Sequence, residues 1–328
     1  RLTLSEKRIE EIAEGAAQLI QLPDPCGRTL KRWTLPNGLD IIRTSVPFGV
    51  IAMIYESRPN VTADAAALCL KSGNACVLRG GKEAHFTNEA MTDILHEVLR
   101  GAGVEEAAVT SILDPDRSLV HTLLTLRGLI DLVIPRGGAG LIRSVVETST
   151  VPVIETGSGV CHTYVDKDAD LAKALPVIVN AKTQRPSVCN AMETLLIHQQ
   201  IAPECIASVF PALRAKGVEI RGDERVQALD PSVLPAVQED WSTEYGALIL
   251  SVSIVDSLED AISHIRKYST GHSECIMSEN KETIRKFMNS IDAACVYANA
   301  STRFTDGFEF GFGAEIGIST QKLHVRGP

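Results

Sequence analysis

From residue 47 onward, short apolar runs alternate with amphipathic stretches, and this alternation limits the fold more than any other feature. Apolar runs at residues 50–54, 75–78 and 130–134 are separated by helix-period stretches, among them 62–71 and 83–99. Runs that are apolar throughout are typical of strands buried in a parallel sheet with helices on both faces. The sequence therefore predicts an α/β fold.

The same alternation continues to about residue 299 in a second α/β series. Further strands are expected at residues 109–113, 151–154, 194–198, 218–221, 247–255, 275–277 and 295–299. Further helices are expected at residues 119–126, 141–148, 170–182, 203–215, 258–268 and 283–290. A chain of 328 residues with this pattern suggests two domains.

The segment before the first α/β series has two strand-like stretches with no helix between them. Residues 28–35 and 39–44 have strand character, and Pro36-Asn37-Gly38 between them is a turn signal, so a β-hairpin is expected. Two isolated strands are only marginally stable, so the hairpin needs something to pack on, and another subunit is one candidate.

Composition excludes several classes of function. The net charge is −9 and the sequence pI is about 5.5, without a Lys- or Arg-rich block, which argues against nucleic acid or an anionic membrane as the main partner. No apolar stretch is long enough to span a bilayer. The eight cysteines form no C-x-x-C pair, which argues against a metal site and a disulfide framework and favours a reduced, cytoplasmic protein.

Cys189 is the candidate nucleophile. A polar turn, Gln184-Arg185-Pro186-Ser187, delivers it directly before an apolar, β-branched run. A thiol held at the rim of a sheet can meet both a substrate and a cofactor. The alternative is that Cys189 is a small buried hydrophobe, as most cysteines are.

Two glycine turns at strand ends are candidate phosphate sites. Gly137 and Gly138 precede a helix, where backbone N–H groups can face an anion; the alternative is a tight structural turn. The second turn joins two cations to two glycines and suits a ribose or a 2′-phosphate; the alternative is a solvated turn. Its residues are Arg79, Gly80, Gly81 and Lys82.

Two acids and one polar cluster complete the candidates. Glu155 ends a strand-like run and is either a general base or a loop acid; Glu244 is either a ribose ligand or a surface acid. The terminal cluster has the donors and charges that an amino acid's carboxylate and ammonium need, unless it is Gly-rich disorder. Its candidates are Asn299, Ser301, Thr302, Arg303 and Glu315.

Taken in order, these segments resemble the aldehyde dehydrogenase superfamily, over essentially every residue of the chain. The most specific are residues 189–194 (Cys-Asn-Ala-Met-Glu-Thr) and 299–304 (Asn-Ala-Ser-Thr-Arg-Phe); the others are 47–50, 56–60, 82–84, 134–137 and 324–328. More narrowly, the chain is similar to the branch of that superfamily that acts in proline biosynthesis. By this resemblance we expect it to begin within the family's N-terminal helical region and to stop before the family's usual end.

The resemblance implies NADPH-dependent reduction of L-glutamyl 5-phosphate to L-glutamate 5-semialdehyde, with phosphate released and a thioacyl intermediate on Cys189. A CoA-acylating aldehyde dehydrogenase and a catalytically silent protein on this fold are the alternatives. The 299–304 cluster, suited to a zwitterion, argues against the first, and an intact Cys189 argues against the second.

The resemblance also implies roles for single residues. Ser57, Arg58 and Pro59 line the NADP cleft, and Arg58 or Arg185 receives the leaving phosphate. Asn60 lies near the substrate but departs from the superfamily's Pro-Trp-Asn motif, so the backbone N–H of Cys189 is the expected oxyanion donor. Glu155 matches a water-activating glutamate; activated water would hydrolyse the thioester, so a structural or cofactor-lining role is expected.

The implied architecture is a Rossmann-type cofactor domain, an α/β catalytic domain and a β-hairpin oligomerisation arm. The expected boundaries are 1–160 for the NADP-binding domain, with its hairpin at 27–45, and 161–306 for the catalytic domain. Residues 307–328 are expected to return to the cofactor domain as a substrate loop. The expected partners are glutamyl 5-phosphate, channelled from a glutamate 5-kinase, and further copies of the chain in a homodimer or homotetramer.

Overall fold

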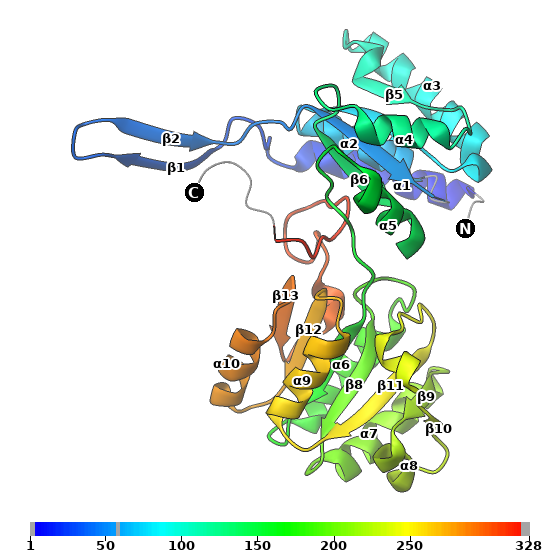
Figure 1. The fold of residues 1–328 in the computed structure, drawn as a ribbon, viewed down its shortest axis with the longest axis vertical. Helices are drawn as coiled ribbons and strands as arrows, with labels where there is room; N and C mark the ends of the chain where they lie inside the picture. Colours follow the sequence, from blue (N-terminus) through cyan, green and yellow to red (C-terminus); the bar gives the residue numbers. More distant parts are fainter. Residues whose placement is uncertain (1–3, 57–59, 323–328) are drawn as a thin grey trace. The chain divides into compact units, whose positions relative to one another are not determined.

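Two parallel sheets organise the chain, each in its own unit (Figure 1). The computed structural model describes residues 4–56 and 60–322. Unit 1 runs to Thr156 and also includes Gly313–Gly317; unit 2 holds Gly157–Phe312 and the described residues after Gly317. The first unit thus ends near the boundary expected at 160, whereas the tail expected to return to it as a whole is divided between the two units.

Unit 1 is built on a four-stranded sheet in the order β5-β4-β3-β6, in which all neighbours are parallel. Its strands are β3 (Val50–Tyr55), β4 (Ala75–Arg79), β5 (Val109–Ser111) and β6 (Leu132–Arg136). Its helices are α1 (Glu6–Gln21), α2 (Asn60–Lys71), α3 (His85–Gly101), α4 (Ser118–Thr125) and α5 (Ala139–Thr148), with short 3-10 turns η1 (Lys82–Ala84) and η2 (Glu106–Ala108).

Both faces of this sheet are covered. Met53 of β3 packs in one core with residues of α2 and α3, whereas its neighbours Ala52 and Ile54 pack in another core with residues of α4 and α5. Successive strand residues point to opposite faces, so a strand between two helical layers must be apolar throughout. This is the physical origin of the short apolar runs in the sequence.

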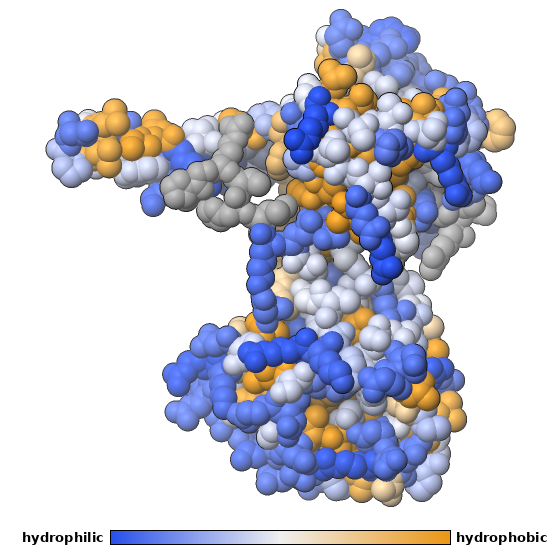
Figure 2. Space-filling model, viewed as in Figure 1, coloured by the Kyte–Doolittle hydropathy of each residue, from blue (hydrophilic) through white to orange (hydrophobic). Residues whose placement is uncertain are grey.

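A separate antiparallel hairpin of β1 (Thr29–Thr34) and β2 (Asp40–Thr44) projects from unit 1 (Figure 1). Gly38, with a φ of 86°, makes the turn, and the Asn37 side chain accepts the Leu39 N–H. Figure 2 shows apolar side chains gathered on the arm, where Leu30 and Ile42 are exposed. The predicted hairpin is confirmed, and its apolar side chains lie open in the isolated chain.

Unit 2 is built on a seven-stranded parallel sheet in the order β10-β9-β11-β8-β7-β12-β13. Its strands are β7 (Cys161–Val165), β8 (Met192–His198), β9 (Glu219–Gly222), β10 (Leu234–Pro235), β11 (Ile249–Val255), β12 (Ser273–Met277) and β13 (Cys295–Ala298). Its helices are α6 (Leu171–Thr183), α7 (Ala202–Ala215), α8 (Glu224–Leu229), α9 (Leu258–Tyr268) and α10 (Lys281–Ser290), with 3-10 turns η3 (Gln238–Ser242) and η4 (Thr302–Phe304).

This sheet too is covered on both sides. Leu195 and Ile197 of β8 pack in one core with residues of α6 and α7, whereas Leu196 packs in another with residues of α9 and α10. The predicted α/β fold with parallel sheets is confirmed. Among the described residues, no helix is long and apolar enough to cross a membrane.

The strand expected at residues 151–154 is wrong. Val153 forms only an isolated bridge with Val133, because Pro152 has no N–H to contribute to a ladder. The chain still follows the sheet edge, with Val133 N–H donating to Pro152 O and Ile154 N–H to Val133 O. The sequence patterns also did not single out α8 and β10, which are short.

Candidate active site

Cys189 lies in the turn between α6 and β8. The residue before Pro186 is disfavoured in helical conformation, so α6 ends at Thr183 and an irregular segment follows. Ala191 N–H donates to Val188 O at 3.0 Å, which turns the chain into the fully buried strand β8. Cys189 itself is half-buried, so it stands where a rigid strand meets the protein surface.

Two residues at the start of β7, Gly159 and Cys161, hold the Cys189 backbone. The Cys161 thiol donates to Cys189 O at 3.2 Å, and burial raises the pKa of that thiol, which keeps it a donor. Gly159 lies so close that an added Cβ would be 1.4 Å from Cys189 O. The carbonyl of the candidate nucleophile is therefore fixed by a hydrogen bond and by steric contact.

Asn190 and Arg303 join the Cys189 turn to the segment after β13. Asn190 Nδ2 donates to Thr305 O at 2.8 Å, and Asn190 Oδ1 accepts from Arg303 Nη1. Arg303 Nε also donates to Gln184 Oε1 at 3.0 Å. The structure thus brings Arg303, expected to bind substrate, together with the Cys189 turn, but these contacts are made to the protein's own amides.

The other members of the terminal cluster are packed around the same segment. Asn299, with a φ of 54°, uses its amide to pair with the Ser278 N–H at 3.0 Å and the Ser278 carbonyl at 2.8 Å. Ser301 is buried and its hydroxyl accepts the Arg303 N–H at 3.3 Å. Thr302 Oγ1 is buried and has no hydrogen-bond partner among the described residues. Arg185 is exposed on the Cys189 turn.

Glu244 reaches the same region of unit 2. Its carboxylate accepts a hydrogen bond from the Gly159 backbone, and burial raises its pKa. Because Gly159 also touches Cys189, Glu244 is linked to the backbone of the candidate nucleophile through one residue. Its side chain is exposed, so this one backbone hydrogen bond ties a surface acid to the Cys189 region.

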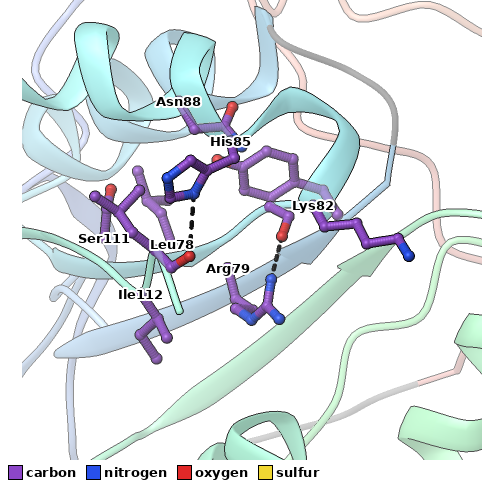
Figure 3. A pocket seen from close by; sticks show the side chains of 11 residues that line it. Leu78, Arg79, Lys82, His85, Asn88, Ser111 and Ile112 are labelled. Atoms are coloured by element: carbon purple, nitrogen blue, oxygen red, sulfur yellow. Dashed lines mark hydrogen bonds between the residues drawn. The ribbon is translucent and has the colours of Figure 1, made fainter. Parts of the chain in front are cut away.

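In unit 1, the turn after β4 borders a small hollow of about 10 Å³, close to the volume that one water needs (Figure 3). Arg79 is buried; its guanidinium donates to Gly80 O, while its Nε has no partner among the described residues. Lys82 is exposed and extends away from the hollow. At Gly80 a Cβ would lie 2.1 Å from Asn88 Nδ2, so a larger residue there would have to displace the Asn88 amide; Gly81 follows and precedes η1.

The glycine turn before α5 already faces a carboxylate. Gly138 N–H donates to Glu56 Oε2 at 3.0 Å, and a Cβ on Gly137 would lie 2.6 Å from the same oxygen. A helix N-terminus attracts negative charge, and here Glu56 supplies it. An incoming phosphate would have to displace that side chain.

The remaining expected site residues of unit 1 are spread over three segments. Asn60 begins α2, and its Nδ2 donates to Asp64 Oδ2 at 2.8 Å. Glu155 is half-buried, and Glu315 is exposed in the segment that returns to unit 1. Ser57, Arg58 and Pro59 lie outside the described residues.

The sequence patterns did not single out the residues that contact the Cys189 backbone, nor the carboxylate that binds the glycine turn before α5. Cys161 and Gly159 act through their neighbours in space, and no local pattern marks them. For Glu56 a signal existed, since an acid directly after a buried strand lies at the carboxyl edge of the sheet. No group of three or more metal-ligating side chains occurs within residues 4–56 and 60–322.

A sequence model of the "Aldehyde dehydrogenase family" matches residues 3–228. This match agrees with the two parallel sheets and with a cysteine on the turn that enters a buried strand. The chain belongs to the aldehyde dehydrogenase family and is an oxidoreductase.

Individual relatives show which branch of the family this chain is similar to. The gamma-glutamyl phosphate reductases of Moorella thermoacetica and Carboxydothermus hydrogenoformans are 57% and 58% identical over the whole chain, which covers 78% and 79% of their lengths. The crystal structure of the gamma-glutamyl phosphate reductase of Thermotoga maritima matches with a TM-score of 0.96 and 52% identity, over all of this chain and 79% of that one. Within the family, the chain groups with the gamma-glutamyl phosphate reductases.

Proposed function

We propose that the protein reduces L-glutamyl 5-phosphate to L-glutamate 5-semialdehyde with NADPH, releasing phosphate, as a step of proline biosynthesis. Its membership among proteins named gamma-glutamyl phosphate reductase supports the substrate. One structural observation carries the chemistry: a half-buried thiol, Cys189, on a turn whose backbone is fixed by Cys161, Gly159 and Asn190.

Cys189 is the proposed nucleophile. Its thiolate attacks the acyl carbon, a C–S bond forms, and the C–O bond to phosphate breaks with its electron pair leaving on phosphate. The Cys189 backbone N–H is the proposed donor to the oxyanion that forms on the acyl oxygen. When the thioester has been reduced, the C–S bond breaks and returns the electron pair to the Cys189 sulfur as the aldehyde leaves.

NADPH, when bound, supplies the hydride that reduces the thioester. The turn after β4 fits an anionic group of this cofactor, because Arg79 presents a buried Nε without a partner among the described residues and Lys82 adds an exposed cation. We propose that Arg79, Gly80, Gly81 and Lys82 hold its ribose and 2′-phosphate. Gly137 and Gly138 remain proposed for a further phosphate, on condition that Glu56 withdraws.

Substrate recognition is proposed for the segment that contacts the Cys189 turn. Thr302 offers a buried, unpartnered hydroxyl within the described part of the chain, and Arg185 offers an exposed cation on the turn itself for the leaving phosphate. Asn60, Asn299, Ser301, Arg303 and Glu315 stay candidates, although several already bind protein groups. For cofactor contacts in unit 2 we propose Glu244, and in unit 1 Glu155.

The reverse reaction tests this proposal. The protein is mixed with glutamate 5-semialdehyde and NADP⁺, and NADPH formation is followed by absorbance with and without inorganic phosphate. We expect continued NADPH formation only when phosphate is present, because phosphate must release the acyl group from Cys189 before a second turnover. NADPH formation that depends on CoA instead would make the protein a CoA-acylating aldehyde dehydrogenase, and no turnover with either would support a silent protein.

A further inference from the structure

A buried ion pair joins the two ends of the segment that carries Cys189. Lys182 lies in the last turn of α6 and Glu193 is the second residue of β8, with Nζ 2.6 Å from Oε2. Neither side chain is more than 1% exposed. The two residues are 11 positions apart, and Cys189 lies on the chain between them.

The stability of the fold does not by itself account for this pair. Burial is the largest influence on both groups: it raises the pKa of Glu193 to about 7 and lowers the pKa of Lys182. Taking two charges out of water costs free energy that their mutual attraction often fails to recover, and well-packed apolar residues frequently do as well. A charge-assisted hydrogen bond is directional, so it fixes the relative position of the two segments that it joins more strictly than apolar packing does.

The same pair holds the segment that carries Glu244. Glu193 Oε1 accepts the Gly246 N–H at 3.4 Å, and Lys182 Nζ lies 5.9 Å from the centroid of the Tyr245 ring. Tyr245 is fixed further by its hydroxyl, which donates to Asp240 Oδ1 at 2.8 Å. The ion pair therefore reaches both residues that follow Glu244.

The Glu244 segment is in turn connected to Cys189 through Gly159. Glu244 accepts from the Gly159 backbone, and Gly159 lies against the Cys189 carbonyl. The path from the ion pair through the Glu244 segment to the nucleophile runs entirely within unit 2. Moving the Glu244 segment would thus shift Gly159 and, through it, Cys189.

We propose that Lys182 and Glu193 are positioning residues, which keep the Cys189 turn and the Glu244–Gly246 segment in a fixed relation to each other. The inference rests on the proposed function in one respect, namely that Cys189 is the nucleophile. Neither residue touches substrate; both act through the backbone that carries Cys189 and Glu244.

The test replaces the pair by apolar side chains of similar size, Lys182→Met with Glu193→Leu. The urea midpoint, the rate of Cys189 alkylation by iodoacetamide and the kcat and KM of the phosphate-dependent reaction are measured. We expect a midpoint close to that of the parent, a KM little changed, and a kcat lowered by roughly 10- to 100-fold, the scale of a misplaced reacting group. The alkylation rate of Cys189 should change in parallel with kcat.

A control removes a more exposed ion pair of unit 2, Arg214–Asp230, whose Nη1 and Oδ2 are 2.8 Å apart. Arg214→Met with Asp230→Leu should leave kcat and the alkylation rate at parent values. Parental kcat and alkylation in the Lys182/Glu193 double variant would overturn the proposal, as would an equal loss in the control.

If the double variant does not fold, Glu193→Gln decides, because it keeps the side-chain shape and an acceptor for Gly246 while removing the charge. A lowered kcat at unchanged KM supports the proposal, and parental kcat overturns it. Failure of the proposed function is separate: it appears as missing phosphate-dependent turnover in the parent, in which case the alkylation rates alone decide this inference.

Discussion

At the scale of single residues, the candidate site is defined by what surrounds Cys189 rather than by the cysteine itself. The thiol stands on a turn that contacts the start of β7 and the residues after β13, and the Glu244 segment reaches this turn through Gly159. Preorganisation of this kind keeps a nucleophile in one geometry, so that little motion is needed before attack.

Replacing Cys189 tests its proposed role as the nucleophile. Cys189→Ser should remove nearly all activity while NADPH binding, followed by fluorescence titration, stays within about a few-fold, because a hydroxyl is a poorer nucleophile and leaving group than a thiol. Cys26→Ser, a half-buried cysteine of unit 1, serves as the control and should stay active. A comparable loss of NADPH binding in Cys189→Ser would mean that the cysteine is structural.

Gly159 offers a steric test of the same turn. In Gly159→Ala the new methyl would lie 1.4 Å from Cys189 O, so the backbone of the turn must move. We expect loss of most activity and a destabilisation of about 3 kcal/mol or more, as for a severe overpacking. In the control Gly157→Ala, the nearest atom is Thr320 Oγ1 at 3.3 Å, and the effects on urea midpoint and activity should be small. Equal effects of the two substitutions would rule out a special role for Gly159.

The cations after β4 are predicted to select the cofactor. Neutralising both in Arg79→Gln with Lys82→Gln should weaken NADPH far more than NADH, with each lost charge-assisted contact costing roughly 1.5–3 kcal/mol. Dissociation constants for the two cofactors provide the measurement, and Lys71→Gln in the same unit provides the control. Equal weakening of NADPH and NADH would assign the 2′-phosphate to other residues.

At the scale of elements, the hairpin leaves apolar side chains uncovered in the isolated chain. Leu30 and Ile42 are 57% and 50% exposed on β1 and β2. Two strands need a further surface to be stable, and an unpaired strand edge is a ready template for pairing. We therefore propose that the hairpin joins a sheet or core of another copy of the chain.

Leu30→Asp with Ile42→Asp should shift the protein from a dimer or tetramer toward monomer in sedimentation at micromolar concentration, because burying two carboxylates at the contact is unfavourable. Lys31→Asp on the same strand controls for the added charge alone. A parent that already sediments as a monomer would contradict the proposed oligomeric role.

At the scale of the whole molecule, each unit has its own sheet and its own pair of cores, so each carries its own stability. In unit 2, His272 is fully buried, with Nδ1 2.8 Å from Ser273 Oγ, and burial lowers its pKa to about 4. A histidine that stays neutral in the fold but protonates when unfolded makes the unfolded state gain more protons on acidification.

The sign follows directly. Above the unfolded pKa of about 6.5, His272 is neutral in both states and does not affect the free energy of unfolding. As the pH falls from there toward about 4, only the unfolded state takes up the proton, so the protein loses stability, roughly 2 kcal/mol by pH 5. Urea midpoints of unit 2, followed by the fluorescence of Trp241, should therefore fall between pH 7 and pH 5. They should fall less in His272→Leu, which has no proton to gain. Identical slopes in parent and variant would mean that other groups carry the acid sensitivity.

Local patterns in the sequence were enough to predict the class of fold. Apolar runs at strand length, helix-period stretches between them and the Asn37-Gly38 turn each describe the conformation of neighbouring residues, and the structure confirms the parallel sheets and the hairpin. The failure at residues 151–154 has the same local origin, since Pro152 interrupts a run that is otherwise suited to a strand.

What surrounds Cys189 was decided only by the tertiary structure. Asn190 meets Thr305 across 115 positions of sequence, and Glu56 meets Gly138 across 82. Such pairs depend on which strands become neighbours in a sheet, and the hydrophobic periodicity of the sequence does not predict strand order. Even Lys182 and Glu193, close in sequence, meet only because α6 packs on β8. Sequence alone determined most of the elements and pointed to the candidate cysteine, whereas packing determined which side chains hold that cysteine in place.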